Sequence, residues 1–371
     1  MPVQSSPLAS LTQKSWFKLI TGASFQDLPQ VYNLALAYTL AGADCIDVAA
    51  DPAVIQAAQE GMDRAIALCP SQPRPLLMVS INDGEDPHFR KAWFNPENCP
   101  PDCPRPCVSI CPAAAIEFKE PIEFEAPSQG VLDYRCYGCG RCLPICPIQQ
   151  IQTYAQPASL ERLAPLIHSG QVQALEIHTR PDRQREFSTL WQQVAPWQSH
   201  LQVLAISCPD GEYLLDYLHW IADLIGPLQG ALIWQTDGRP MSGDIGDGTT
   251  RAAIQLGQKV LQGNLPGFVQ LAGGTNGHTV AKLRAMGLLI SPADQGLVQP
   301  AIAGVAYGSY ARTLLAPFHA QSSQWHQSPS LLRQAVSQAA TLVSQIKALP
   351  PSLWLNSLPD NAKLQTISTN S

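Results

Sequence analysis

Three short apolar runs decide the fold: Ala174-Leu-Glu-Ile-His178, Val203-Leu-Ala-Ile-Ser207 and Ala231-Leu-Ile-Trp-Gln235. Each is mainly apolar rather than strictly alternating, which is typical of parallel strands that are buried on both faces. Helical patterns over 185–197 and 212–227 separate the three runs. Strands that recur after each helix predict an α/β fold with a parallel sheet.

The same alternation continues in both directions along the chain. The further predicted strands are 17–22, 45–49, 76–81, 268–272 and 302–307. The further predicted helices are 28–42, 52–68, 159–169, 249–262, 278–286 and 308–318. Eight strand–helix units predict a (β/α)8 barrel, with a doubly wound sheet as the alternative.

The alternation breaks once, over a stretch rich in proline and cysteine that follows the third strand. We interpret residues 84–157 as an inserted ferredoxin-like domain, with the barrel formed by 15–83 and 158–349. Residues 350–371 are polar and are expected to form a flexible tail. Because the insertion falls in the third strand-to-helix connection, we expect it on the C-terminal face of the barrel, where active sites lie.

The second half of the insertion reads Cys136-Tyr-Gly-Cys139-Gly-Arg-Cys142-Leu-Pro-Ile-Cys146-Pro147. This is the C-x2-C-x2-C-x3-C-P spacing of bacterial-type ferredoxins. Three closely spaced thiolates wrap one cubane, and the glycines between them let the backbone approach and donate N–H groups to sulfur. The fourth thiolate points towards a second cluster.

The first half of the insertion carries a wider version of the same motif. It reads Cys99-Pro-Pro-Asp-Cys103-Pro-Arg-Pro-Cys107-Val-Ser-Ile-Cys111-Pro112, with one more residue in each of the first two gaps. The endings VSICPAAAI at 108–116 and LPICPIQQI at 143–151 match closely. This internal repeat is typical of two-cluster ferredoxins.

The spacing therefore predicts two 4Fe–4S clusters with crossed ligation. Cluster one is predicted to take Cys99, Cys103, Cys107 and Cys146, and cluster two Cys136, Cys139, Cys142 and Cys111. The wider first motif leaves a 3Fe form open at one site, and four thiolates also suit zinc. The remaining cysteines, Cys45, Cys69 and Cys208, are expected to be structural, with a reactive role open for Cys208.

The composition and charge of the chain exclude several classes of protein. The chain has 371 residues, of which 11 are cysteines, and a net charge of -6 without a basic run, which argues against nucleic-acid binding. No apolar stretch of about 18 residues predicts a transmembrane helix. The N-terminus lacks the pattern of a secretory signal, so we expect a cytoplasmic protein whose clustered cysteines bind metal.

Two glycine-bearing loops predict a ligand site in the barrel. Gly273, Gly274 and Thr275 follow the seventh strand, and Gly308 and Ser309 follow the eighth, where phosphate-binding barrels supply backbone N–H groups. The alternative is that these glycines simply form tight turns. The loops resemble those of the flavin-mononucleotide barrels of the dihydroorotate and dihydropyrimidine dehydrogenase kind, although no lysine sits at a strand end and no obvious base occupies the expected loop.

Polar residues after other strands are candidates for the same mouth. They are His178 and Arg180 after the fourth strand, and Asp237, Arg239, Asp244 and Asp247 after the sixth. Each alone is more often a capping or ion-pairing residue than a catalyst. Together on one predicted face they are worth testing.

Several segments resemble the cyanobacterial light-dependent period protein (LdpA) family. They are SWFKLITGASFQDLP at 15–29, CIDVAADP at 45–52, and the two cysteine motifs over 99–116 and 134–151. The resemblance implies a redox-sensing iron–sulfur protein that relays the redox and light state of the photosynthetic cell to the circadian clock and associates with clock proteins.

These observations support two main hypotheses about function, from different classes, and a third. The leading hypothesis is a sensor or electron-transfer protein whose cluster oxidation state, set by a quinone or ferredoxin pool, alters partner binding. The rival is an oxidoreductase whose clusters pass electrons to a flavin or phosphate-bearing substrate in the barrel mouth. A purely structural role for the clusters is the third.

Overall fold

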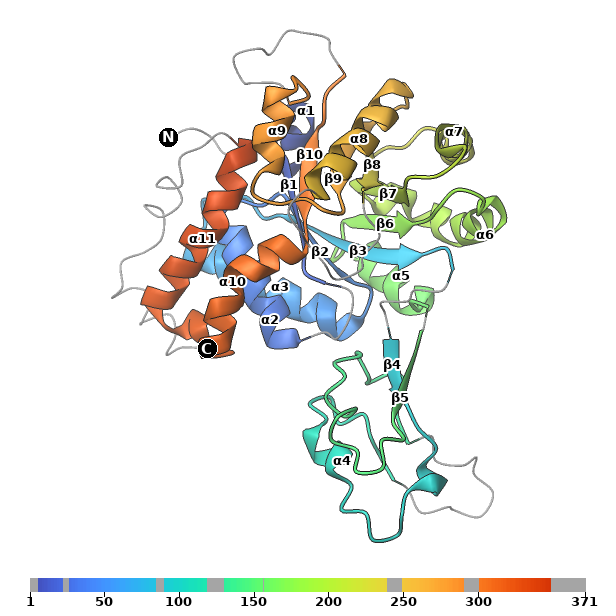
Figure 1. Ribbon diagram of the computed structural model, residues 1–371, viewed down its shortest axis with the longest axis vertical. Coiled ribbons are helices and arrows are strands. Elements are labelled where there is room, and N and C mark those ends of the chain that lie inside the picture. The colour runs from blue at the N-terminus through green and yellow to red at the C-terminus, as the bar shows by residue number, and fades with distance from the viewer. Residues whose placement is uncertain are drawn as a thin grey trace.

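The computed structural model describes residues 6–22, 27–84, 90–118, 130–155, 157–238, 249–289 and 300–347, and the predicted tail over 350–371 lies outside them. Its centre is a closed barrel of parallel strands in the order β1-β10-β9-β8-β7-β6-β3-β2 (Figure 1). The strands are β1 Trp16–Ile20, β2 Cys45–Ala49, β3 Leu76–Asn82, β6 Ala174–His178, β7 Val203–Pro209, β8 Ala231–Asp237, β9 Phe268–Ala272 and β10 Gly304–Tyr307. The predicted (β/α)8 barrel is confirmed, and the doubly wound alternative is wrong.

Helices follow the strands and cover the outside of the barrel. The predicted ones are α2 Leu28–Leu40, α3 Pro52–Leu68, α5 Leu160–His168, α6 Gln184–Val194, α7 Leu214–Ile225, α8 Thr249–Gln262, α9 Thr279–Ala285 and α10 Ser309–Gln321. The barrel helices that the sequence analysis did not predict are α1 Pro7–Thr12 and α11 Pro329–Lys347, with short 3-10 turns η2 Ala195–His200 and η4 Trp325–Gln327.

Local sequence signals explain where the first helices begin and end. The Asp51 side chain accepts a hydrogen bond from the Ala53 N–H at 2.9 Å, and Pro52 occupies the first turn of α3, so this is a capped helix start. Gly42 follows α2 with φ 91°, a left-handed conformation that glycine adopts without strain.

The barrel interior changes character along its axis. Near the amino ends of the strands the interior is apolar. Trp16, Met78 and Ile233 pack together there, and Leu11 of α1 packs against them at this end of the barrel. Nearer the carboxyl ends the inward side chains are polar, among them Lys18, Glu176 and Gln235, all buried. A second and larger apolar layer lies between the sheet and the helices.

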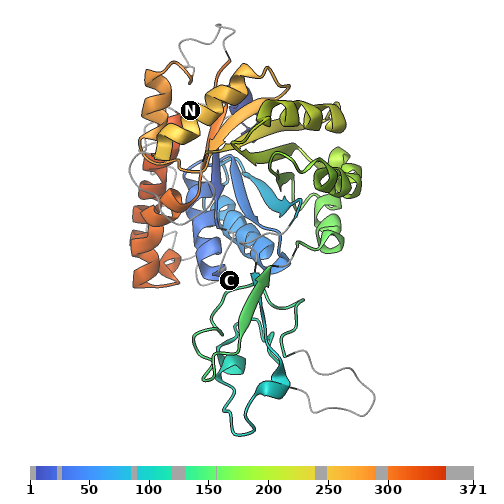
Figure 2. The same cartoon turned by 45° about the vertical axis from the view of Figure 1, so that its right-hand side comes forward.

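The cysteine-rich segment leaves and re-enters the barrel through one pair of strands. β4 Arg90–Trp93 and β5 Gln152–Ala155 pair antiparallel, with Arg90 opposite Ala155 and Trp93 opposite Gln152. The segment lies between β3 and α5, and projects away from the barrel as one lobe (Figures 1 and 2). Its other elements are the 3-10 turn η1 Pro96–Asn98, α4 Pro106–Ile110 and an isolated bridge between Ile116 and Val131.

We predict that Gly61→Ala destabilises the protein by about 1–3 kcal/mol, because a Cβ at Gly61 of α3 would overlap the carbonyl oxygen of Tyr32 in α2. In an open helix position the same change stabilises by up to about 1 kcal/mol. Thermal unfolding followed by circular dichroism measures the effect. Glu60→Ala, at the exposed neighbouring position, is the control. An unchanged or raised Tm for Gly61→Ala would contradict this packing.

Candidate iron–sulfur site and barrel mouth

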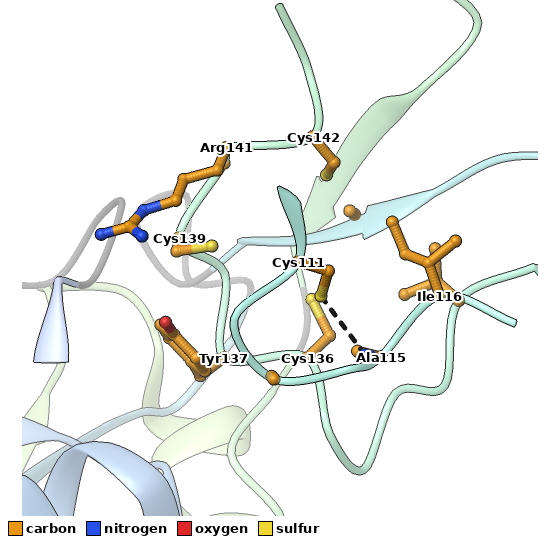
Figure 3. Close-up of a pocket in the computed structure, with 12 residues that line it drawn as sticks. Cys111, Ala115, Ile116, Cys136, Tyr137, Cys139, Arg141 and Cys142 are labelled. Atoms are coloured by element: carbon orange, nitrogen blue, oxygen red, sulfur yellow. Dashed lines mark hydrogen bonds between the residues drawn. The ribbon is translucent and has the colours of Figure 1, made fainter. Parts of the chain in front are cut away.

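Four cysteines from both motifs surround one cavity in the insertion. The lining of the cavity includes Cys111 of the first motif together with Cys136, Cys139 and Cys142 of the second (Figure 3). We call these four residues the second cysteine set. It contains the same residues that the crossed rule predicts for cluster two.

Backbone geometry places the second cysteine set. Gly138 has φ 79°, and a Cβ there would overlap the carbonyl oxygen of Arg90, so glycine is required where the motif passes β4. Cys111 Sγ accepts a hydrogen bond from the Ala115 N–H at 3.3 Å (Figure 3). The backbone N–H groups of Ala92 and Gly138 point at the Cys136 thiol in the same way. These sulfur atoms therefore face donors, as thiolates require.

The remaining four cysteines, Cys99, Cys103, Cys107 and Cys146, form the first cysteine set. Burial and then the neighbouring Cys103 raise the pKa of Cys99, to which Cys146 also contributes. Cys107 is close enough to Cys99 and Cys146 for both to raise its pKa, after burial. Cys146 thus lies with the first motif although it belongs to the second in sequence.

N–H donors also surround the first cysteine set. Gln150 Nε2 donates a hydrogen bond to Cys99 Sγ at 2.8 Å. Burial raises the pKa of Cys146, but the backbone N–H groups of residues 148–151 outweigh burial and hold this pKa below its usual value. Hydrogen bonds to cysteine sulfur favour the thiolate, the form that binds metal.

The donor chemistry fits iron–sulfur clusters. Each set offers four thiols, and burial with the neighbouring Cys136 and Cys139 raises the pKa of Cys142 to about 12. Four thiolates so close together repel one another unless cations bind between them. Among the described residues, no three His, Cys, Asp or Glu side chains are grouped as a single metal ion would need. A cubane is held differently, by one thiolate on each iron of a cage.

The second cysteine set adjoins the barrel. Tyr137 is 4% exposed and packs into the apolar layer of the barrel, together with the half-buried Cys139. The Arg141 guanidinium lies 3.6 Å from the Asp27 carboxylate at the start of α2, and Lys91 Nζ lies 4.0 Å from Asp51 at the start of α3. Charge at this set is therefore linked to the first turns of two barrel helices.

The first cysteine set has different surroundings. Its helix α4 lies in the part of the insertion away from the barrel (Figures 1 and 2). Large apolar side chains near this set are about 40% exposed or more: Val108, Ile110, Ile145 and Ile148. Exposed apolar side chains therefore lie near the first set, whereas the second set contacts the barrel through Tyr137 and Cys139.

The barrel interior holds an ionic network that the sequence analysis missed. Lys18, in the middle of β1, is fully buried; its Nζ lies 2.9 Å from Asp47 Oδ2 and also pairs with Glu176. Burial lowers the pKa of Lys18, but the two carboxylates outweigh it and raise this pKa above its usual value. Gln235 accepts from Lys18 at 2.9 Å and donates to Glu176 at 2.6 Å. The sequence signal that could have revealed this network is a single charged residue inside an otherwise apolar strand, as at Lys18, Asp47 and Glu176.

Two of the predicted mouth residues join this network. His178 Nε2 lies 3.1 Å from Glu176 Oε1, and Asp237 at the end of β8 lies within the electrostatic reach of His178, Glu176 and Lys18. Burial raises the pKa of Asp237 to about 6, against the opposing effect of His178. Arg180 is exposed, whereas Arg239, Asp244 and Asp247 lie outside the described residues.

The predicted phosphate loops lie at the same end of the barrel, after β9 and β10. Gly273 and Gly274 have φ of 59° and 91°, and Thr275 Oγ1 donates to the Ala306 carbonyl oxygen at 2.6 Å, which ties the two loops together. Gly308 is the N-cap of α10 and Ser309 its first residue. Ligand binding by these residues stays a prediction.

The other cysteines lie in apolar surroundings. Cys45 and Cys208 are buried, and burial raises both pKa values far above those of reactive thiols. Cys69 is also buried and lies 3.5 Å from Ser71 Oγ. These environments favour the structural interpretation over a reactive Cys208.

Matches to known proteins agree with the cysteine chemistry. Residues 99–157 match the LdpA Fe-S cluster-binding domain. The fold and this match define the chain as an iron–sulfur protein built on a (β/α)8 barrel. Residues 166–345 match the Light dependent period A C-terminal domain, and residues 4–85 match a domain of unknown function, DUF561.

One relative covers nearly the whole chain. "Light dependent period A" of Synechococcus elongatus is 50% identical over 347 residues, which are 92% of this chain and 94% of the relative. The chain belongs to the Light dependent period A family.

Solved structures show only distant similarity. The tryptophan synthase alpha subunit of Legionella pneumophila has a TM-score of 0.44 at 9% identity, covering 93% of this chain and 100% of its own. The (S)-3-O-geranylgeranylglyceryl phosphate synthase of Thermoplasma acidophilum has a TM-score of 0.31 at 11% identity, covering 94% and 100%. Within the described part of the chain, no helix is long and apolar enough to span a membrane.

We predict that Asp237→Asn stabilises the protein more at pH 8 than at pH 5. The folded-state pKa of about 6 exceeds the usual 3.8, so the folded protein holds this proton more tightly, and the resulting stability is lost as pH rises through 6. Removing the charge recovers up to about 3 kcal/mol above pH 7. Tm values at the two pH values measure this. Asp210→Asn, an exposed carboxylate after β7, should give the same offset at both. A pH-independent difference for Asp237→Asn would contradict the assignment.

Proposed function

We propose that this chain is a two-cluster iron–sulfur protein that senses redox state by electron transfer and contributes to a light-dependent input to the circadian period. The single observation that carries this proposal is the crossed arrangement of the cysteines. Cys146 lies with the first motif, and Cys111 lines the cavity formed with the second. This is the ligand exchange typical of two-cluster ferredoxins.

In this proposal each cysteine set holds one 4Fe–4S cluster. The first set, Cys99, Cys103, Cys107 and Cys146, takes the cluster nearer the exposed apolar side chains. The second set, Cys111, Cys136, Cys139 and Cys142, takes the cluster against the barrel. Such clusters supply one-electron transfer at potentials that the protein sets by hydrogen bonds to sulfur and by solvent access.

The chain's own residues then give a direction to the exchange. Electrons from a quinone or ferredoxin pool enter beside the exposed Ile145 and Ile148, next to the first set. The second set adjoins Tyr137 and Arg141, which contact the barrel. A change of charge there acts on the ion pairs at the starts of α2 and α3. A cytoplasmic clock protein that binds this surface would complete the relay. The name of the relative, "Light dependent period A", refers to a light-dependent period.

A second candidate function is an oxidoreductase with its active site in the barrel mouth. The observation that favours it is the buried network of Lys18, Glu176 and His178 at the end where barrel active sites lie. Perturbed ionisable groups at such a place are typical of catalytic sites. Stoichiometric flavin in the visible spectrum of anaerobically purified protein would favour the enzyme. Broad iron–thiolate absorption without flavin bands would favour the sensor.

We predict that Cys139→Ala halves the metal content of the anaerobically purified protein. The wild type should contain about eight iron atoms and eight sulfides per chain, four of each per cubane, and the variant about four. Colorimetric iron and sulfide analysis checks this. Cys208→Ala, which removes a buried thiol outside both sets, should keep the full content. Zinc in the wild type, or full iron in Cys139→Ala, would rule out the proposal.

We predict that Gln150→Leu lowers the reduction potential of one cluster and leaves the other unchanged. The Gln150 N–H donor at 2.8 Å from Cys99 Sγ stabilises the more negative, reduced state. A hydrogen bond worth about 1 kcal/mol corresponds to roughly 40 mV for one electron. Redox titration followed by electron paramagnetic resonance measures the shift. Gln152→Leu, at an exposed position in β5, is the control, and equal potentials in all three proteins would refute this role.

A further inference from the structure

Two cations of the insertion lie close both to the second cysteine set and to the barrel. Lys91, in β4, is within electrostatic reach of Cys136, and its Nζ lies 4.0 Å from Asp51 Oδ2. Arg141 lines the cavity of the second cysteine set, and its Nη2 lies 3.6 Å from Asp27 Oδ1. Each cation therefore has predicted cluster ligands near it as well as a barrel carboxylate.

Neither of these two ion pairs is closed by a hydrogen bond. Both distances exceed about 3.2 Å, the usual upper limit for an N–H···O bond. Asp27 Oδ1 is screened from water and accepts no hydrogen bond within the described part of the chain. Asp51 Oδ1 accepts from the Ala53 N–H of α3, whereas Lys91 Nζ donates to the Asp133 carbonyl oxygen of the insertion. The pairs are thus held by charge, and they can lengthen without the loss of a directed bond.

The pair formed by Lys91 and Asp51 is the less hydrated of the two. Their side chains are 6% and 9% exposed, whereas those of Arg141 and Asp27 are 45% and 44% exposed. Charges interact more strongly where less water and salt screen them. We therefore expect Lys91 to respond more than Arg141 to a change of charge at the second cysteine set.

We infer that Lys91 and Arg141 are shared between the second cluster and the barrel, so that reduction of this cluster weakens the contact between the insertion and the barrel. This inference rests on the proposed function, because it requires a 4Fe–4S cluster at the second cysteine set. A one-electron donor is oxidised and the cluster gains its electron. No covalent bond of the protein changes, and no proton moves.

The added negative charge attracts both cations and draws them away from Asp51 and Asp27. The coupling also acts in the opposite direction, because a coupling free energy between two sites is reciprocal. The two barrel carboxylates therefore oppose reduction of the second cluster, both directly and by holding the cations. This reverse effect can be measured as a reduction potential.

The test is redox titration of the anaerobically purified full-length protein, followed by electron paramagnetic resonance. We expect Asp51→Asn to raise the potential of one cluster by about a fivefold change in its reduction equilibrium, or roughly 40 mV, and to leave the other unchanged. Asparagine keeps the N-cap of α3. Lys91→Gln should lower the same potential. Asp63→Asn is the matched control, because Asp63 pairs with Arg74 about 18 Å further along the same helix.

The double variant Asp51→Asn/Lys91→Gln distinguishes a shared cation from charges in fixed positions. The two effects on the potential would add if neither charge changed its position. We expect Asp51→Asn to raise the potential by less when Lys91 is absent, because no ammonium then moves towards the cluster. Additive effects, or a wild-type potential in Asp51→Asn, would overturn the inference.

The second pair covers the case in which Lys91→Gln does not fold. Arg141→Gln, at a half-exposed position, and Asp27→Asn then form the same cycle with the same expected signs. Hydrogen exchange followed by mass spectrometry gives a separate readout, which should be faster at residues 133–141 in the dithionite-reduced protein than in the oxidised protein. Equal exchange in both states would contradict the weakened contact.

Iron analysis of each variant separates the two possible failures. A wild type without clusters would reject the proposed function together with this inference. Full iron content combined with additive potentials would reject this inference alone and leave the cluster proposal intact.

Discussion

The cysteine lobe depends on bonds between thiolates and metal, because apolar burial alone is too small to hold it together. Its described apolar cluster consists of Ala92, Phe94, Cys107, Ile116, Val131, Cys142, Cys146 and Ile151. Three of these eight side chains are predicted ligands. Small units with so little core are usually held by metals or disulfides, and metal binding is then part of their folding free energy.

The crossed arrangement of the cysteines strengthens this dependence. Cys111 and Cys146 each lie with the set of the other motif, so neither half of the lobe completes its own site. The barrel, in contrast, has a continuous apolar layer under its helices and an apolar plug beside α1. The fold thus joins a self-sufficient scaffold to a lobe with little core of its own. Tyr137 and Cys139 pack against the barrel, and the Arg141–Asp27 and Lys91–Asp51 pairs connect the two parts as well.

Most of the barrel could be predicted from local sequence because each buried strand is a short apolar run and most of the helices are amphipathic, although α2 is buried along most of its length. α11 was missed, although it packs against the barrel and Lys347 reaches Asp44 at 2.7 Å. Lys18 was missed because its partners, Asp47 and Glu176, are far away in sequence and meet it only when the barrel closes. The cysteine sets could be proposed from sequence because the spacing of the cysteines is what allows their thiolates to reach the irons of a cubane. The stalk strands β4 and β5 are polar and four residues long, and their pairing is not visible locally.

The single stalk has a topological consequence. Because β4 and β5 pair with each other and both barrel connections leave from this one ladder, the lobe interrupts the scaffold at one junction between β3 and α5. An insertion of any length at that junction leaves the order of the barrel strands unchanged.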